Sequence, residues 1–225
     1  MGRRLSVVLP VLNEAGCLAD TLACLQPLRQ RGHQVILADG GSDDDSVRIA
    51  TPLVDDVLTG PAGRGRQMNQ GAGRADGDVL LFLHADTRVP AHVDRVILTA
   101  LGSCSGWGRF DIGLSGSHPL LRLVELSMNL RSRLTRIATG DQGLFVSRDL
   151  FERCGGFSEQ PLMEDIDLSR ALKRLSRPLC LPQRLVTSSR RWEQRGMLRT
   201  VMLMWYLRAA YFLGVPAERL ARRYY

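Results

Sequence analysis

The sequence has few cysteines, and their spacing does not suggest a disulfide framework. Its five cysteines are scattered, no two form a CxxC pair, and their number is odd. The N-terminus has no signal-peptide pattern either, because the apolar stretch 5–12 is short and contains Pro10. These features argue against a disulfide-stapled secreted domain and predict reduced thiols in a cytoplasmic protein.

Long apolar runs are also missing. The most hydrophobic late segment, 197–215, is interrupted by Arg199 and Arg208, so its uncharged runs are too short to span a bilayer. These arginines fall on opposite faces of a helix, whereas a helix that lies on a membrane gathers its charges on one face. We expect the segment to pack on the domain. Peripheral membrane contact through the basic C-terminal region, giving a membrane-associated protein, is the alternative.

Positive charge is in excess and is nearly all arginine. The net charge is +7, and the excess lies after Arg122. Arginine binds phosphate oxygens bidentately, so the candidate partners are a phosphorylated small molecule, an anionic membrane surface or nucleic acid. Aromatic residues are not interleaved with the basic ones, and acidic clusters in the first half would repel a polyanion. We therefore expect no nucleic-acid partner.

Strand-like and helix-like patterns alternate along the chain. The first half predicts strands at 5–12, 34–38, 54–58 and 79–83, and helices at 15–31, 44–50, 67–75 and 91–101. The second half predicts strands at 107–114, 143–146, 179–181 and 185–188, and helices at 120–137, 149–154 and 164–175, followed by a long closing helix. This order predicts an α/β fold with a mostly parallel central sheet flanked by helices. The length of 225 residues suits one domain, divided into segments 1–104, 105–196 and 197–225.

Carboxylates follow predicted strands or begin predicted helices in four segments. These segments are Asn13-Glu14, Asp39-Gly40-Gly41, His84-Ala85-Asp86 and Glu164-Asp165. Ligands bind at the carboxyl ends of strands in open parallel sheets, so we expect the site there. Acids in the first turn of a helix are also favoured by the helix dipole alone, which is the alternative for Glu14 and Glu164. Asn13 is a candidate N-cap of the helix that follows it.

Two of these segments suggest specific chemistry. In an extended chain, His84 and Asp86 project to the same side, where an imidazole and a carboxylate can hold Mg²⁺ or Mn²⁺. The alternative is that Asp86 caps a turn and His84 is a half-buried polar residue. Asp165 lies between the apolar residues Met163 and Ile166, which indicates the partial burial that suits a general base. An ordinary N-cap is the alternative for Asp165.

The order of these motifs resembles one known family. "PVLNE", "DGGSDD", "HAD" and "MEDIDLSRAL" precede a late "RRW", and this series is similar to the family 2 glycosyltransferases of the GT-A fold. The stretch "GRGRQMNQGAGRADGDVLLFLHADT" and the single-domain length are similar to a small bacterial subgroup, the arsenosugar biosynthesis-type glycosyltransferases. The resemblance covers nearly the whole chain.

The resemblance implies a nucleotide-binding half (1–104), an acceptor-side half (105–196) and a C-terminal helical tail (197–225). In the family, a DxD motif binds the divalent cation, here Mn²⁺ or Mg²⁺. His84 replaces the first Asp of that motif, so the metal site would consist of Asp86 and His84. The ED motif of the family supplies the catalytic base, which corresponds to Asp165, with Glu164 beside it as a second catalytic residue.

The donor and acceptor sides follow from the remaining motifs. The glycine-rich "GPAGRGRQMNQGAG" places Arg64 and Arg66 for phosphate contacts, with a solvated basic loop as the alternative. The QxxRW motif of the family is half present, because Ser188 stands where the Gln would be; this argues against a processive polymer synthase. Arg191 and Trp192 match the rest of that motif on the acceptor side. The predicted nucleotide-binding residues are Pro10, Asn13, Glu14, Asp39, Gly41, Arg64, Arg66, Asn69 and Ala85.

The predicted function is inverting transfer of a sugar from a nucleotide-diphosphate sugar, with UDP favoured, to the hydroxyl of an unknown acceptor. Two alternatives stay open. A sugar nucleotidyltransferase shares a related sheet and metal site, although "PVLNEAG" has no Lys or Arg in the turn where those enzymes carry one. A catalytically weak nucleotide-sugar-binding protein would explain the altered DxD motif. A dinucleotide-binding protein is excluded because no GxGxxG follows the first strand.

Overall fold

The computed structural model describes residues 3–224, with the side chains of all of these except positions 191, 194 and 195. Its centre is one eight-stranded sheet with the order β3-β2-β1-β4-β7-β6-β8-β5. Among the strands of the described chain, β5 and β7 run against their neighbours, so the predicted mostly parallel sheet is confirmed. The strands are β1 (Leu5–Val11), β2 (Gln34–Asp39), β3 (Asp56–Thr59), β4 (Val79–Phe82), β5 (Thr87–Arg88), β6 (Trp107–Leu114), β7 (Leu144–Ser147) and β8 (Leu179–Thr187).

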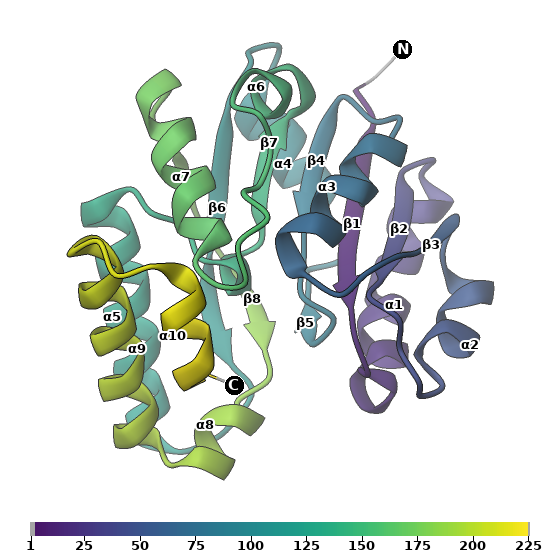
Figure 1. Ribbon diagram of the computed structural model, residues 1–225. Coiled ribbons are helices and arrows are strands. Elements are labelled where there is room, and N and C mark those ends of the chain that lie inside the picture. Colours follow the sequence, from purple (N-terminus) through teal and green to yellow (C-terminus); the bar gives the residue numbers. More distant parts are fainter. Residues whose placement is uncertain (1–2, 225) are drawn as a thin grey trace.

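Helices cover both faces of the sheet (Figure 1). Alternate side chains of β1 therefore enter two different cores: Leu5, Val7 and Leu9 lie in one, and Val8 lies in the other. This arrangement explains why the central strands are almost continuously apolar. The first core includes α1 (Ala15–Gln30) and α4 (Val93–Leu101); the second includes α3 (Arg64–Arg74), α6 (Arg148–Arg153) and α7 (Glu164–Leu175).

Four helices gather at one end of the molecule, beside β6 and β8 (Figure 1). They are α5 (Pro119–Thr135), α8 (Arg190–Arg195), α9 (Met197–Phe212) and α10 (Ala217–Tyr224). Ile112 of β6 packs in one cluster with Leu121 of α5 and Val201 of α9. Leu207 of α9 and Leu220 of α10 belong to another cluster. Within residues 3–224, no helix combines the length and the apolar character that crossing a bilayer requires.

Several predicted boundaries differ from the structure. The closing helix is divided into α8, α9 and α10, because Gly196 and Gly214 adopt positive φ angles of 82° and 88°. The two predicted strands 179–181 and 185–188 form the single strand β8, and a shift in its register with β6 explains the apparent interruption. Helix α3 begins at residue 64 instead of 67, and β5 was not predicted.

The start of α1 also differs from the prediction. Glu14, and not Asn13, is its N-cap residue. Asp44, which precedes α2 (Ser46–Ala50), accepts a hydrogen bond from the backbone N–H of Ala15 at 2.9 Å. The first free N–H of α1 is therefore satisfied by an acid from the loop after β2, and not by the residue next to it in sequence.

Candidate active site

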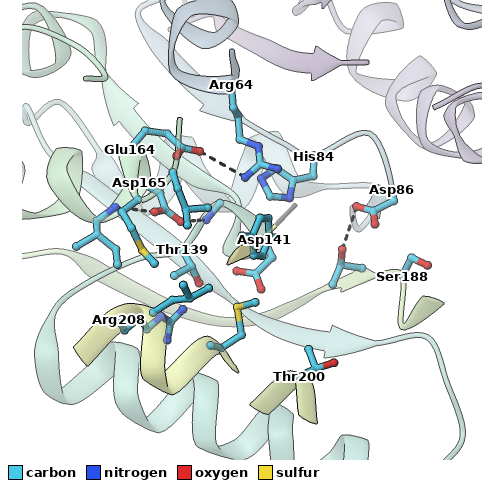
Figure 2. Close-up of a pocket in the computed structure, with 18 of the residues that line it drawn as sticks. Arg64, His84, Asp86, Thr139, Asp141, Glu164, Asp165, Ser188, Thr200 and Arg208 are labelled. Carbon is cyan, nitrogen blue, oxygen red and sulfur yellow. Dashed lines mark hydrogen bonds and ion pairs between the residues drawn. The ribbon is translucent and has the colours of Figure 1, made fainter. Parts of the chain in front are cut away.

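A cavity of about 310 Å³ lies where the carboxyl end of β4, the start of α7 and the C-terminal helices meet. It contains seven of the residues predicted from the sequence, and Figure 2 labels Arg64, His84, Asp86, Glu164 and Asp165 among them. The parallel strands β1 and β4 end at this edge of the sheet, as expected for a ligand site of an open α/β sheet. The predicted residues in the cavity wall are Glu14, Arg64, His84, Asp86, Glu164, Asp165 and Trp192.

His84 and Asp86 follow β4 and both line the cavity. The expected extended chain is wrong here, because the N–H of Thr87 donates to the carbonyl of His84 at 3.1 Å and closes a turn that contains Asp86. Oδ1 of Asp86 accepts a hydrogen bond from the Thr187 hydroxyl at 3.1 Å, which fixes the carboxylate against the end of β8 (Figure 2). No group of three or more His, Cys, Asp or Glu side chains that could hold a metal occurs in the described part of the chain. Two protein ligands are still enough for a cation that takes its remaining ligands from donor phosphates and water, so this pair fits Mg²⁺ or Mn²⁺.

Asp165 is held by backbone groups on two sides. Its Oδ2 accepts from the N–H of Gly140 at 2.8 Å, and its Oδ1 accepts from the N–H of Ile166 at 2.7 Å. Gly140 lies in a short 3₁₀ helix, η2 (Gly140–Gln142), just before β7. A Cβ at position 140 would collide with the imidazole of His84. Gly140 therefore lets the predicted metal ligand and the predicted base approach the same backbone segment.

Glu164 is buried and pairs with Arg64. Its side chain is 3% exposed, and its Oε1 lies 3.4 Å from Nη1 of Arg64, which is 33% exposed. Burial, together with the charge of neighbouring Asp165, raises the pKa of Glu164 above its ordinary value, and Arg64 opposes this shift. Glu164 and Asp165 are adjacent in sequence, but their environments differ: one is paired inside the protein, and the other lines the cavity with its oxygens on backbone donors.

Glu14 links the first strand to the C-terminal part of the site. Its Oε2 lies 3.5 Å from Nη2 of Arg190 and accepts a hydrogen bond from Sγ of Cys17 at 3.3 Å. Burial, then the charge of Glu14 and its hydrogen bond, raise the pKa of Cys17 to about 12. Cys17 therefore stays a neutral thiol beside the site and is a poor nucleophile at neutral pH.

The other predicted nucleotide-binding residues lie outside the lining of this cavity. Asp39 is buried, and its carboxylate accepts from the backbone N–H groups of Gly41, at 3.0 Å, and Ser42. Gly41 has a φ of 87°, which allows this tight turn. Asn13 joins the same loop, since its Oδ1 accepts from the N–H of Asp43 at 3.0 Å. Their roles toward a nucleotide stay predictions.

Two residues of α3 contact the loop before α7. The amide of Asn69 donates to the carbonyl of Phe157 at 2.8 Å and accepts from its N–H at 2.9 Å, and Arg66 pairs with Glu159 at the surface. These contacts tether the loop, and nucleotide binding by Asn69 and Arg66 stays a prediction. Pro10 lies in β1, and the carbonyl of Ala85 accepts from Sγ of Cys17. The predicted acceptor residue Arg191 lies outside the described side chains.

The cavity contains polar residues that the sequence did not single out. Asp141 and Thr139 come from the segment around η2, and Arg208 comes from α9 (Figure 2). Ser188, at the position of the missing Gln, also lines the cavity, as does Arg190. Ser188 and Arg190 fall within the half-present QxxRW motif, whereas Thr139, Asp141 and Arg208 lie in segments without a recognisable motif. A short turn before a strand and an arginine inside an apolar helix have no local pattern that indicates a site.

Comparison with known proteins supports the same fold and family. Residues 6–103 match the family model described as "Glycosyl transferase family 2". TarS residues 1–349 from S. aureus, in complex with UDP, is 16% identical with a TM-score of 0.67, over 82% of this chain and 60% of that one. Mannosyltransferase PcManGT from Pyrobaculum calidifontis, in complex with GDP-Man and Mn²⁺, is 20% identical with a TM-score of 0.69, over 99% of this chain and 65% of that one.

A third solved structure matches most of both chains. Glucosyl-3-phosphoglycerate synthase from Mycobacterium tuberculosis, in complex with Mn²⁺, UDP and phosphoglyceric acid, is 22% identical with a TM-score of 0.64, over 96% of this chain and 80% of that one. This chain spans about 60% of the length of the TarS structure. The protein therefore has the GT-A fold. The resemblance to the family 2 glycosyltransferases is confirmed by the family model over residues 6–103.

Proposed function

We propose that this protein is an inverting glycosyltransferase that moves a sugar from a nucleotide-diphosphate sugar to an acceptor hydroxyl. The observation that supports this most strongly is the cavity itself. One wall carries His84 and Asp86, and another carries Asp165 and Glu164 (Figure 2). A cation site next to a carboxylate base is the combination that transfer from a diphosphate leaving group needs.

The donor side of the proposal uses the residues after β4 together with Arg64. Asp86 and His84 would hold a divalent cation, Mn²⁺ or Mg²⁺, which neutralises the leaving diphosphate when it is bound. Arg64 lines the same cavity and would contact the donor phosphates from the side of α3. Solved structures of the same fold contain UDP in TarS and GDP-Man with Mn²⁺ in PcManGT. By analogy we infer a nucleotide-sugar donor, with UDP favoured.

The acceptor side uses Asp165 as the base. Its carboxylate takes the proton of the acceptor hydroxyl while that oxygen attacks the anomeric carbon. The bond from the anomeric carbon to the diphosphate breaks in the same displacement, the nucleoside diphosphate leaves, and the anomeric configuration inverts. The hydrogen bonds from Gly140 and Ile166 hold the carboxylate in place for this step.

The proposal is tested with a panel of UDP- and GDP-sugars in the presence of Mn²⁺ or Mg²⁺. Donor binding is measured by thermal shift, because a bound donor raises the melting temperature by mass action. Turnover is measured as release of nucleoside diphosphate, first to water and then to candidate acceptors. The expected result is cation-dependent release that an acceptor stimulates, with the acceptor-stimulated part abolished in Asp165→Asn without loss of donor binding.

Two other results would contradict the proposal. Release of pyrophosphate from a nucleoside triphosphate and a sugar 1-phosphate would indicate a nucleotidyltransferase. Tight donor binding without turnover on any acceptor class would indicate a binding protein.

A further inference from the structure

A second cavity lies beside the candidate active site, between α5 and α9. Its volume is about 280 Å³, and its lining includes the apolar Ile137, Ile166, Trp205 and Phe212 together with Arg131 and Arg208. We call this cavity the α5–α9 groove. Ile166 and Arg208 also line the first cavity, so the groove and the candidate active site share a wall.

The helices that flank the groove leave large apolar side chains in solvent. Leu126, Leu130 and Leu134 of α5 are 64%, 53% and 74% exposed, and Met202 and Trp205 of α9 are 73% and 70% exposed. Residues three or four positions apart share one face of a helix, so each helix presents an apolar stripe. Contiguous exposed apolar surface next to a cavity marks a binding site more often than scattered single residues do.

The charges of these two helices have one sign wherever they reach solvent. Their arginines are Arg122, Arg131, Arg133, Arg199 and Arg208. The acidic residue among them, Glu125, is buried and pairs with Arg122 at 2.8 Å. A surface that is both apolar and positive is complementary to an amphiphile with a negative head group.

Two of these arginines indicate where such a head group would bind. Arg131 and Arg208 both line the groove. Burial, and next the charge of Arg208, lower the pKa of Arg131 to about 10, although the charges of Asp141 and Asp165 oppose this shift. Among the described residues, Nε of Arg131 is buried without a hydrogen-bond partner. An anion between the two guanidinium groups would relieve their repulsion and accept from this donor.

We propose that the α5–α9 groove binds the apolar chain of an amphiphilic acceptor, whose anionic head group lies between Arg131 and Arg208. The proposal rests on the proposed glycosyltransferase function and names the acceptor class for the same site. The shared wall places the head group of such an acceptor next to the cavity that holds Asp165. The tail extends away from the sheet, along the exposed stripes of α5 and α9.

The test uses dodecyl phosphate as the probe, below its critical micelle concentration, with dodecyl maltoside as a neutral-headed probe of equal chain length. Binding is measured by calorimetry and by tryptophan fluorescence, without donor. Dodecyl phosphate should bind with one molecule per chain and at least about tenfold more tightly than dodecyl maltoside, a difference of about 1.4 kcal/mol.

Variants locate the binding site of the probe. Trp205→Ala and Arg208→Gln should each weaken dodecyl phosphate by about tenfold, whereas Arg208→Lys, which keeps the charge, should weaken it less. Leu175→Ala is the matched control, because Leu175 is a 46% exposed apolar residue at the end of α7 that neither lines the groove nor lies on α5 or α9. Circular dichroism of each variant excludes loss of folding as the cause.

Each other outcome has a definite meaning. Equal losses in Leu175→Ala and Trp205→Ala, or binding to anionic vesicles that neither Trp205→Ala nor Arg208→Gln changes, would overturn the proposal in favour of general surface adsorption. A wild-type dimer that Trp205→Ala converts to monomers, without probe binding, would overturn it in favour of self-association. Donor binding and turnover are measured on the same preparations. If the groove does not bind the probe, the wild-type protein still turns over donor. If the protein is not a glycosyltransferase, the groove still binds the probe.

Discussion

Asp165→Asn tests the role of Asp165 as the base while keeping the size of its side chain. The two carboxylate oxygens of Asp165 accept from the N–H groups of Gly140 and Ile166 at 2.8 and 2.7 Å. An asparagine has one carbonyl oxygen, so it can keep one of these bonds and must give up the other. A hydrogen bond to a charged group contributes about 1.5–3 kcal/mol, so we expect the free energy of unfolding to fall by about that amount.

The expected effect on transfer is larger. A positioned general base contributes about 10²–10⁴-fold, which corresponds to about 3–5 kcal/mol of activation free energy at 1.36 kcal/mol per tenfold. Asparagine cannot take the acceptor proton at any accessible pH, although its size and its contact with one backbone N–H are preserved. The variant should therefore remain folded, bind donor and cation normally, and transfer sugar very slowly.

The assay is transfer to a true acceptor, with donor and cation affinities measured by calorimetry on the same protein. Donor hydrolysis alone is insufficient, because water can attack without this base. Glu164→Gln is the matched control: it also replaces a carboxylate by an amide in the same motif, and its remaining oxygen can still accept from Arg64. We expect a smaller loss there. If Asp165→Asn transfers sugar at the wild-type rate while Glu164→Gln is inactive, the assignment of the base is wrong.

Three further predictions concern the metal, the nucleotide and pH. Asp86→Ala should abolish Mn²⁺-dependent donor binding in calorimetry, and His84→Ala should weaken it less because a neutral imidazole neutralises no cation charge; unchanged affinity in Asp86→Ala would contradict the metal site. Asp39→Asn should weaken donor binding by about 1–3 kcal/mol by spoiling a buried charged acceptor, and equal dissociation constants would count against this role. The raised pKa of Glu164 means that the folded protein binds a proton there more tightly than the unfolded chain does, so stability should fall as pH rises above the ordinary value of 4.5. When melting temperatures are measured over a range of pH, Glu164→Gln should show a smaller fall than the wild type. The same dependence of melting temperature on pH in both proteins would contradict this prediction.

The core of the fold and part of the site could be predicted because their signals are local. The apolar run before His84 indicates a buried strand, and the strand end then places His84 and Asp86 at the edge of the sheet. The ED motif similarly marks the start of α7 in advance. The α/β class and the mostly parallel sheet follow from the alternation of strands and helices, which is a local pattern repeated along the chain, whereas the order of the strands is known only from the structure.

The rest of the site depends on contacts between distant segments. Gly140 gives no sequence signal beyond that of an ordinary turn glycine, yet its N–H binds Asp165 and its missing Cβ leaves room for His84. Arg208 lies in an apolar segment, where the sequence alone indicates only a charge that interrupts a membrane span. Asp39 shows the opposite case. Its sequence motif indicates a functional carboxylate at the end of a strand, but does not indicate that this carboxylate accepts hydrogen bonds from the loop that follows.

The continuous sheet described above has a consequence for motion. β4, in segment 1–104, pairs directly with β7, in segment 105–196, over four residue pairs, so the two segments cannot rotate as separate bodies without breaking the ladder between them. Glycosyl transfer requires that water be kept from the anomeric carbon. We therefore expect the site to close by movement of its rim, and not by hinge bending. Two parts of that rim are anchored: the loop before α7 is tethered to α3 through Asn69, and the hydroxyl of Tyr211 in α9 donates to Asp167 of α7, so such a movement has to break these hydrogen bonds.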